Sequence, residues 1–238
     1  EAGFPPGALN VVPGDGPGTG AALVRHPLVD KVAFTGSTET GRAVMREAAA
    51  TNKRISLELG GKSPNVVYAD ADLDAAVRGA QAAIFYGKGE VCAAGSRLLL
   101  ERSVHDEVVS KLAARAAKLA VGDPLDKGTR LGALVSRRQQ EKVLGYIRKG
   151  SQEGARLVAG GKAATHGGKG YFVEATVFDR VAPDMVIARE EIFGPVLAVL
   201  PFEGEGEAAA LANRSAYGLA AGIWTRDIGK AHRTARAI

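Results

Sequence analysis

Apolar residues recur along this chain at two spacings, and the two spacings alternate over most of its length. Short runs rich in apolar residues predict strands at 31–35, 54–58, 65–68 and 97–101. Between these runs, apolar residues recur every three or four positions, which predicts helices. Strands and helices in alternation are typical of an α/β fold built on a doubly wound parallel sheet.

The rest of the chain follows the same two patterns. Further strands are predicted at 8–12, 155–158, 171–181, 192–202 and 219–225, and helices at 19–26, 37–50, 70–86, 104–119, 137–149, 205–212 and 227–238. The glycine-rich segment 160–170 predicts a loop between two of these strands. A change of rhythm at 59–62 predicts a junction between two domains.

The composition is that of an ordinary folded protein. Hydrophobic residues make up 46% and charged residues 24% of the 238 residues, which is enough to bury a sizeable core. No stretch approaches the roughly 18 uninterrupted apolar residues of a membrane span, so we expect no membrane partner. The single cysteine cannot form an intramolecular disulfide, and the cysteine and histidine spacing offers no metal site. A cytoplasmic, reducing setting fits best.

The formal charge of +5 does not indicate nucleic-acid binding. Basic residues are interleaved with acidic ones, as at 137–142, and only 5% of the residues are aromatic. A solvated surface with a mild preference for small anions is the better interpretation. The chain starts at Glu1 and stops at Ile238 inside a predicted helix, so we expect a piece of a longer protein.

The only cysteine, Cys92, lies among small residues in the segment 85–97, between a predicted helix and a predicted strand. Glycines close on both sides would make its thiol accessible to a substrate. A free cysteine is also commonly a small buried hydrophobic residue. The segment by itself leaves both roles open.

Residues 34–41, Phe-Thr-Gly-Ser-Thr-Glu-Thr-Gly, place Gly36 and Ser37 between a strand and the start of a helix. Free backbone N–H groups and the helix dipole make such a start a phosphate site. The spacing of the glycines is not that of the dinucleotide fingerprint, and a tight turn alone would also explain it.

Two acidic stretches add further candidates. Glu58 lies among apolar neighbours at a strand end, and burial there would raise its pKa toward that of a general base. A pairing of Glu58 with Lys53 or Lys62 is the alternative. Residues 189–195, Arg-Glu-Glu-Ile-Phe-Gly-Pro, offer a carboxylate for ribose hydroxyls and an aromatic for a flat ring, or simply a charged loop.

In chain order these stretches are Phe-Thr-Gly-Ser-Thr-Glu-Thr-Gly, Leu-Glu-Leu-Gly-Gly-Lys-Ser-Pro-Asn, the Cys92 loop ending Ala-Gly-Ser-Arg, and Glu-Glu-Ile-Phe-Gly-Pro-Val. Together they closely resemble the motifs of the NAD(P)-dependent aldehyde dehydrogenase superfamily. The resemblance spans essentially all 238 residues and includes 121–124, 170–172 and 212–220. Four motifs in the order of the family make a chance match very unusual.

The resemblance implies an aldehyde dehydrogenase-like α/β fold. Residues 1–61 would be the C-terminal part of a Rossmann-type NAD(P)-binding domain, and 62–238 a catalytic domain truncated at its C-terminus. The implied reaction is oxidation of an aldehyde to a carboxylic acid. Cys92 would be the nucleophile that forms a thiohemiacetal and then a thioester, and Glu58 the base that activates the deacylating water.

The resemblance also implies how the cofactor, NAD or NADP, is held. Gly36 and Ser37 would contact the pyrophosphate, Glu191 the nicotinamide ribose, and Phe193 and Leu59 the neighbouring parts of the cofactor. The substrate would be a small aldehyde, and the full-length form a homodimer or homotetramer. The motifs that supply the oxyanion asparagine and choose between NAD and NADP lie upstream in the family and are absent here, so that choice and the aldehyde stay open.

The Cys92 loop departs from the family pattern, because Gly87, Lys88 and Glu90 stand where many members carry Asn, Gln and Gln. These changes are expected to alter the substrate entrance and to leave the nucleophile intact. Three alternatives remain: a coenzyme A-acylating aldehyde dehydrogenase, which Glu58 argues against; a thiol esterase that needs no nicotinamide; and a non-catalytic protein or incomplete fragment.

Overall fold

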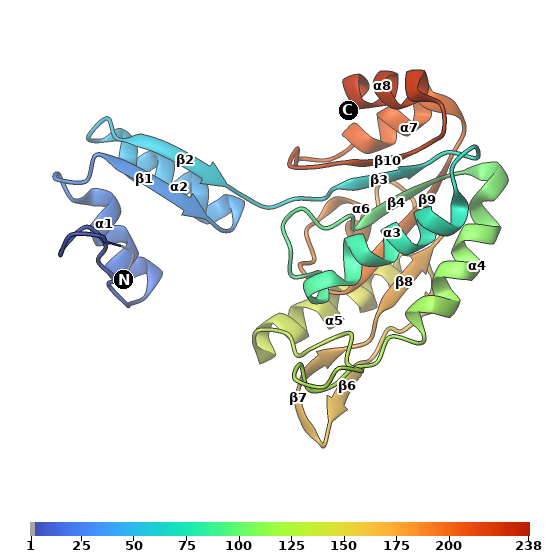
Figure 1. The fold of residues 1–238 in the computed structure, drawn as a ribbon, viewed down its shortest axis with the longest axis horizontal. Helices are drawn as coiled ribbons and strands as arrows, with labels where there is room; N and C mark the ends of the chain where they lie inside the picture. Colours follow the sequence, from blue (N-terminus) through green and yellow to red (C-terminus); the bar gives the residue numbers. More distant parts are fainter. Residues whose placement is uncertain (1–2) are drawn as a thin grey trace. The chain divides into compact units, whose positions relative to one another are not determined.

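A computed structural model describes residues 3–238 (Figure 1). The chain divides into two compact units, residues 1–60 and 61–238. The division falls between Gly60 and Gly61, inside the junction predicted at 59–62. The α/β class expected from the sequence is confirmed.

The first unit holds two parallel strands and the helices that pack on them. Its elements are the π-helical turn Gly16–Gly20, α1 (Ala21–Arg25), β1 (Lys31–Thr35), α2 (Thr38–Ala49) and β2 (Arg54–Glu58). Lys31 lies opposite Arg54 and Thr35 opposite Glu58, so both strands end at the same edge. The chain therefore turns from the end of β1 directly into α2.

The prediction of a strand at 8–12 is wrong. These residues form no ladder in the described unit, and Leu9 and Val11 are 81% and 83% exposed. A run of apolar residues becomes a strand only when a neighbouring strand satisfies its N–H and C=O groups.

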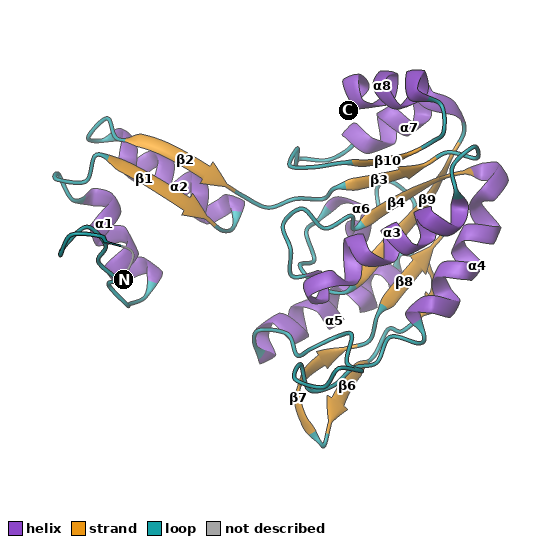
Figure 2. Ribbon diagram, viewed as in Figure 1, coloured by secondary structure: helices purple, strands orange, loops and turns teal. Residues whose placement is uncertain are grey.

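The second unit is built on one six-stranded sheet (Figure 2). Its main elements are β3 (Pro64–Val67), α3 (Leu73–Phe85), β4 (Arg97–Glu101), α4 (His105–Ala116), α5 (Arg137–Gln152), β5 (Arg156–Ala159), β6 (Ala163–His166), β7 (Lys169–Val173), β8 (Thr176–Asp179), α6 (Val186–Arg189), β9 (Val196–Phe202), α7 (Gly204–Asn213), β10 (Gly222–Trp224) and α8 (Ile228–Ala237), with 3-10 turns at Tyr86–Gly89 and Arg102–Val104. The strand order is β10-β3-β4-β9-β8-β5. All neighbours are parallel except β5, which runs antiparallel to β8 at one edge.

Both faces of this sheet are covered by helices. Leu98 and Leu100 of β4 pack into a core with α3 and α4, whereas Leu99 packs into the opposite core with α5, α6 and α7. All three leucines are fully buried. This is why β4 is a continuous apolar run with no polar alternation.

Two predictions in the second unit need correction. The segment expected to be a glycine-rich loop contains most of a hairpin, β6 and β7, which turns at Gly167 and Gly168, both at positive φ. The strand predicted at 171–181 is in fact two, because β7 joins that hairpin and β8 joins the large sheet. The short helix α6 was not predicted.

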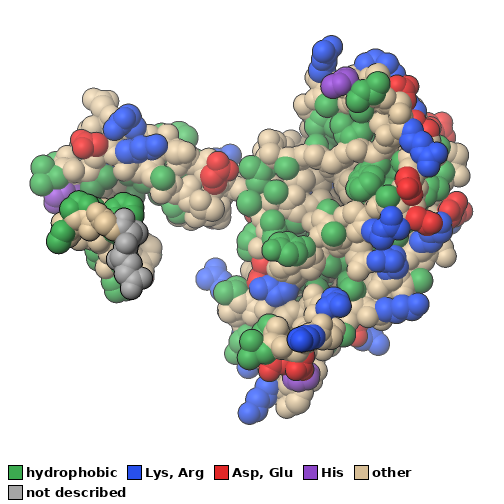
Figure 3. Space-filling model, viewed as in Figure 1, with side chains coloured by type: hydrophobic (Ala, Val, Ile, Leu, Met, Phe, Trp, Pro, Cys, Tyr) green, Lys and Arg blue, Asp and Glu red, His purple; other side chains and the backbone are tan. Residues whose placement is uncertain are grey.

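Basic and acidic side chains are interspersed on the face of the second unit shown in Figure 3, with no continuous basic stripe there. This arrangement agrees with the charge pattern in the sequence. Among residues 3–238, no helix has the length and apolar character needed to cross a bilayer.

The central position of β4 gives a direct test of the fold. Leu99→Ala should lower the free energy of unfolding by about 2–5 kcal/mol, because Leu99 is fully buried and its loss leaves a cavity. Leu125→Ala is the matched control, since Leu125 is 90% exposed and its loss should cost about 0.5 kcal/mol or less. Urea unfolding measures both, and equal values would contradict the assigned core.

Candidate active site

Cys92 lies on a turn that leads into the buried strand β4. The N–H of Ala94 donates to the carbonyl of Val91 (3.1 Å) and closes this turn. The N–H of Gly95 donates to the carbonyl of Ala83 (3.1 Å) and ties the loop to the last turn of α3. The Cys92 residue is half-buried, so the turn holds the thiol-bearing residue at the surface of a well-packed sheet.

Gly61, the first residue of the second unit, lies directly against the cysteine loop. A Cβ atom at Gly61 would collide with the carbonyl oxygen of Cys92. The N–H of Gly61 donates to Oε1 of Glu191 (3.1 Å). Gly61 therefore connects Cys92 and Glu191, two sequence candidates that are 99 positions apart (191 − 92).

The turn after α6 that carries Glu191 and Phe193 is fixed by α5. Phe193 has a positive φ of 57°. The Gln139 side chain of α5 donates to the carbonyls of Ile192 (3.2 Å) and Phe193 (2.6 Å). These two hydrogen bonds hold a backbone conformation that is otherwise unfavourable for an aromatic residue.

The same turn packs against the cysteine loop at a second point. A Cβ atom at Gly89 would collide with the carbonyl group of Gly194, and Gly89 has a φ of 70°. Only glycine meets both requirements. The second unit thus brings the loop of Cys92, Gly61 and the turn of Glu191 and Phe193 together.

In the first unit, Gly36 and Ser37 lie where β1 leads into α2. The N–H of Gly36 donates to the carbonyl of Glu58 (3.0 Å), which places this turn beside the end of β2. Ser37 is the N-cap of α2, and its Oγ accepts from the N–H of Thr40 (3.1 Å). The predicted helix start is therefore present, and both Gly36 and Ser37 are exposed.

A cavity of about 470 Å³ lies between α1 and α2 of the first unit. Val24, Phe34 and Val44 contribute apolar surface to its lining, and Glu39 and Thr40 from the first turn of α2 also line it. This cavity thus combines an apolar lining with the N-terminal turn of α2. We did not predict it from the sequence, although the apolar residues on one side of each helix were the available signal.

One first-unit candidate, Glu58, differs from expectation in its burial. Glu58 ends β2, and its side chain is exposed, so the burial expected for it is not supplied by the first unit itself. Leu59 packs against α2, where a Cβ atom at Gly41 would collide with the Leu59 side chain.

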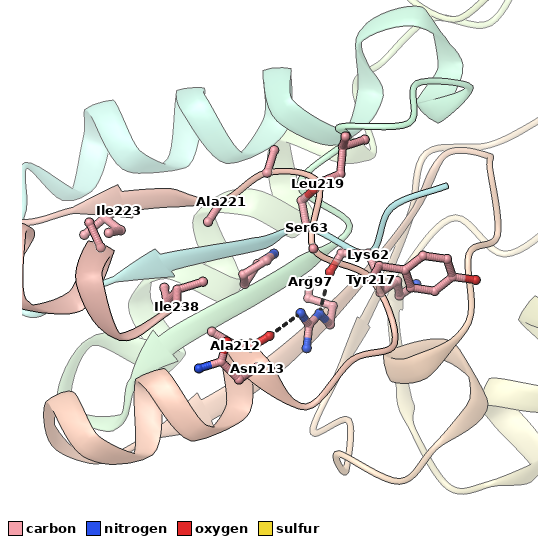
Figure 4. Close-up of a pocket in the computed structure, with 14 residues that line it drawn as sticks. Lys62, Ser63, Arg97, Ala212, Asn213, Tyr217, Leu219, Ala221, Ile223 and Ile238 are labelled. Carbon is pink, nitrogen blue, oxygen red and sulfur yellow. Dashed lines mark hydrogen bonds between the residues drawn. The ribbon is translucent and has the colours of Figure 1, made fainter. Parts of the chain in front are cut away.

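Lys62 lines a cavity of about 360 Å³ (Figure 4). It was not identified from the sequence as a candidate site residue. Its residue is 1% exposed, and its Nζ has no hydrogen-bond partner among the residues described. The pKa of Lys62 is lowered from 10.5 to about 7, mainly by burial and also by the positive charge of Arg97, while Glu191 and Glu190 act in the opposite direction. Its position after two glycines in an apolar stretch was the only sequence signal.

Arg97 is buried beside Lys62, and it joins two parts of the unit. It donates to the carbonyls of Lys62 (2.8 Å) and Ala212 (2.7 Å), which Figure 4 shows. It also donates to the carbonyl of Leu211 (2.9 Å). The last two carbonyls belong to the final turn of α7, where a cation is favoured by the helix dipole. Arg97 thus fixes the start of β4, just after the cysteine loop.

Comparison with known proteins identifies the family of this chain. The aldehyde dehydrogenase family model matches residues 1–238, and the chain belongs to the aldehyde dehydrogenase family. It is similar to the mitochondrial aldehyde dehydrogenase of Homo sapiens, with 50% identity over 239 aligned residues that cover 100% of this chain and 46% of the relative.

Solved structures give the same picture. The NAD+ complex of an aldehyde dehydrogenase from Bacillus cereus is 50% identical with a TM-score of 0.96, over 99% of this chain and 48% of that one. The betaine aldehyde dehydrogenase of Staphylococcus aureus in complex with NAD+ is 41% identical with a TM-score of 0.95, over 99% and 47%. The chain therefore spans about half the length of the relatives it matches.

The close contact at Gly61 predicts a specific effect. Gly61→Ala should push the cysteine loop away, lower the free energy of unfolding by about 1–3 kcal/mol and raise the alkylation rate of Cys92. Gly206→Ala is the control, because a Cβ there meets no atom within 4 Å. An alkylation rate that is the same in both variants would contradict the contact.

The lowered pKa of Lys62 predicts that the stability of the fold depends on pH. Its folded pKa of about 7 lies below the ordinary 10.5, so the unfolded chain binds more protons between these values and stability rises with pH across that window. This group contributes a slope of at most about 1.4 kcal/mol per pH unit.

Lys62→Met should remove that slope, so that its stability advantage over the wild type shrinks from pH 7 to pH 10. Lys118→Met, at an exposed lysine, is the control and should keep the wild-type slope. Unfolding free energies from urea titrations at several pH values measure this. Parallel curves for wild type and Lys62→Met would refute the role of Lys62.

Proposed function

We propose that the protein oxidises an aldehyde to a carboxylic acid with NAD(P)+ and water, and that this chain carries its nucleophile, its base and part of its cofactor site. One observation carries the proposal: Gly61 contacts the carbonyl of Cys92 and donates to the carboxylate of Glu191. A nucleophile and a carboxylate suited to ribose hydroxyls are thereby held on one support. Membership in the family supports the same activity.

The residues present suit a dinucleotide. The start of α2 at Ser37 offers a positive helix end for phosphate, and the cavity between α1 and α2 offers a place for an adenine ring. Glu191 offers an acceptor for ribose hydroxyls, and Phe193 an aromatic surface. When bound, the nicotinamide would accept a hydride from the substrate carbon. The structure of the Bacillus cereus relative is an NAD+ complex, which supports NAD+ as the cofactor of this chain.

Cys92 would begin the reaction. Its thiolate forms a bond to the aldehyde carbon, the carbonyl electrons move to oxygen, and a thiohemiacetal results. The backbone N–H of Cys92 would donate to this oxyanion. Loss of hydride from the same carbon restores the carbonyl and leaves Cys92 acylated as a thioester.

Glu58 would complete the turnover. Its carboxylate takes a proton from water, the hydroxide oxygen bonds to the thioester carbon, and the C–S bond breaks. The carboxylic acid leaves and Cys92 is again a thiolate. A cytoplasmic location and a homodimer or homotetramer belong to this proposal as well, although the relatives include mitochondrial proteins.

Cys92→Ala should lower the rate of NAD(P)+ reduction by about 10³-fold or more, because Cys92 is the single cysteine of this chain and the variant lacks the thiolate that forms the acyl intermediate. The assay is the absorbance of reduced nicotinamide, measured with a panel of small aldehydes. Cofactor affinity should stay within about twofold of wild type. Equal turnover in the variant would exclude Cys92 as nucleophile.

Glu58→Gln should slow deacylation by about 10²–10⁴-fold, so that one burst of reduction precedes a stall. Intact-mass spectrometry should then find the acyl group on Cys92. If the wild-type protein transfers the acyl group to coenzyme A and releases no free carboxylic acid, the result would instead favour the acylating alternative. An unchanged steady-state rate in Glu58→Gln would end the assignment of the base.

A further inference from the structure

The loop of Cys92 contains an ion pair at two of the three positions where the chain departs from the family pattern. Nζ of Lys88 lies 3.1 Å from Oε2 of Glu90. Glu90 is two residues before Cys92, and its own N–H donates to the carbonyl of Gly87 (3.1 Å). The ion pair therefore lies within the short turn that leads to the nucleophile.

Glu90 also reaches outside its own loop. Its Oε1 accepts a hydrogen bond from the N–H of Val135 (3.1 Å). The neighbouring Leu134 donates its N–H to the carbonyl of Tyr171 in β7 (2.8 Å). Through this one carboxylate, the cysteine loop is tied to a segment that is itself held by the β6–β7 hairpin.

Burial distinguishes this pair from ordinary surface pairs. The side chain of Glu90 is 8% exposed and that of Lys88 is 31% exposed. Exposed pairs contribute little to structure, whereas a carboxylate this deeply buried is stable only when its oxygens are satisfied. Both oxygens of Glu90 are used, one by an ammonium and one by a backbone N–H.

The backbone of the loop shows why a restraint is needed. Gly87, Lys88 and Gly89 have φ values of 57°, 63° and 70° in succession. This left-handed conformation suits glycine but is unfavourable for lysine. The ion pair to Glu90 holds Lys88 in it, and Gly89 can then pack against the carbonyl of Gly194.

We propose that Glu90, paired with Lys88 and bonded to Val135, is a positioning residue that fixes the loop of Cys92 for attack on the aldehyde. The proposal rests on the proposed function for the identity of the attacking atom. Glu90 acts through the loop, and it does not itself exchange protons with the substrate.

The test measures two properties of the same variants. The first is the rate of Cys92 alkylation by iodoacetamide over a range of pH, which needs no aldehyde and no cofactor. The second is kcat and the KM for NAD+ in aldehyde oxidation. The variants are Glu90→Ala, Glu90→Gln, Lys88→Gly and the control Glu107→Ala, whose carboxylate pairs with Lys111 on the exposed side of α4.

Glu90→Ala should raise the alkylation rate severalfold, about 3- to 10-fold, because the half-buried thiol becomes more accessible when the loop loosens. It should lower kcat about tenfold or more, because a small displacement of a reacting atom is costly. The KM for NAD+ should change by less than about twofold, since uniform cofactor binding is untouched.

The other variants separate positioning from a general loss of structure. Glu90→Gln keeps an acceptor for the N–H of Val135 and should recover most of kcat. Lys88→Gly keeps the hydrogen bond from Val135 to Glu90 and removes the backbone strain, so its alkylation rate and kcat should lie between those of wild type and Glu90→Ala. Wild-type alkylation and kcat in both Glu90→Ala and Lys88→Gly would overturn the proposal, and Lys88→Gly alone decides it if Glu90→Ala does not fold. Should no variant or wild type oxidise aldehydes, the alkylation rates still decide whether Glu90 restrains the loop.

Discussion

The close approach of two backbones at Gly61 is the constraint on which the candidate site depends. The carbonyl of Cys92 occupies the space where any other residue at position 61 would carry its Cβ, and the N–H of Gly61 points to Glu191. A second close approach, between Gly89 and the carbonyl of Gly194, joins the same two loops. Two glycines thus let a nucleophile loop and a carboxylate turn share one packed support.

That support is rigid because of the sheet behind it. Cys92 precedes β4, which lies between β3 and β9 and is covered by helices on both faces. Arg97, the first residue of β4, is bonded to three carbonyls, including two at the end of α7. The cost of burying this cation is offset by carbonyls that would otherwise lack donors.

Charged groups near the site are used in two different ways. Glu90 pairs with Lys88 and accepts a hydrogen bond from the N–H of Val135, and these two interactions restrain the loop. Lys62 is buried with no hydrogen-bond partner among the residues described, and its pKa moves toward neutrality instead. A buried ion is either paired or partly discharged, and Glu90 and Lys62 illustrate the two cases.

The sequence alone determined the parts that local chemistry controls. The strands β1, β2, β4 and β9 and the helices α2, α3, α4 and α5 were predicted near their observed bounds, because the apolar period is a local signal. Cys92, Glu58, Glu191 and Phe193 were proposed as site residues because their short motifs occur in the order of the family.

Tertiary structure decided what depends on pairing and burial. The run at 8–12 has no strand beside it in its unit, and 171–181 splits because β7 and β8 pair with different partners. The exposure of Glu58, the burial of Lys62 and the tie from Glu90 to Val135 follow from which segments come together in space. Residues far apart in sequence supply those neighbours, so no local pattern could indicate them.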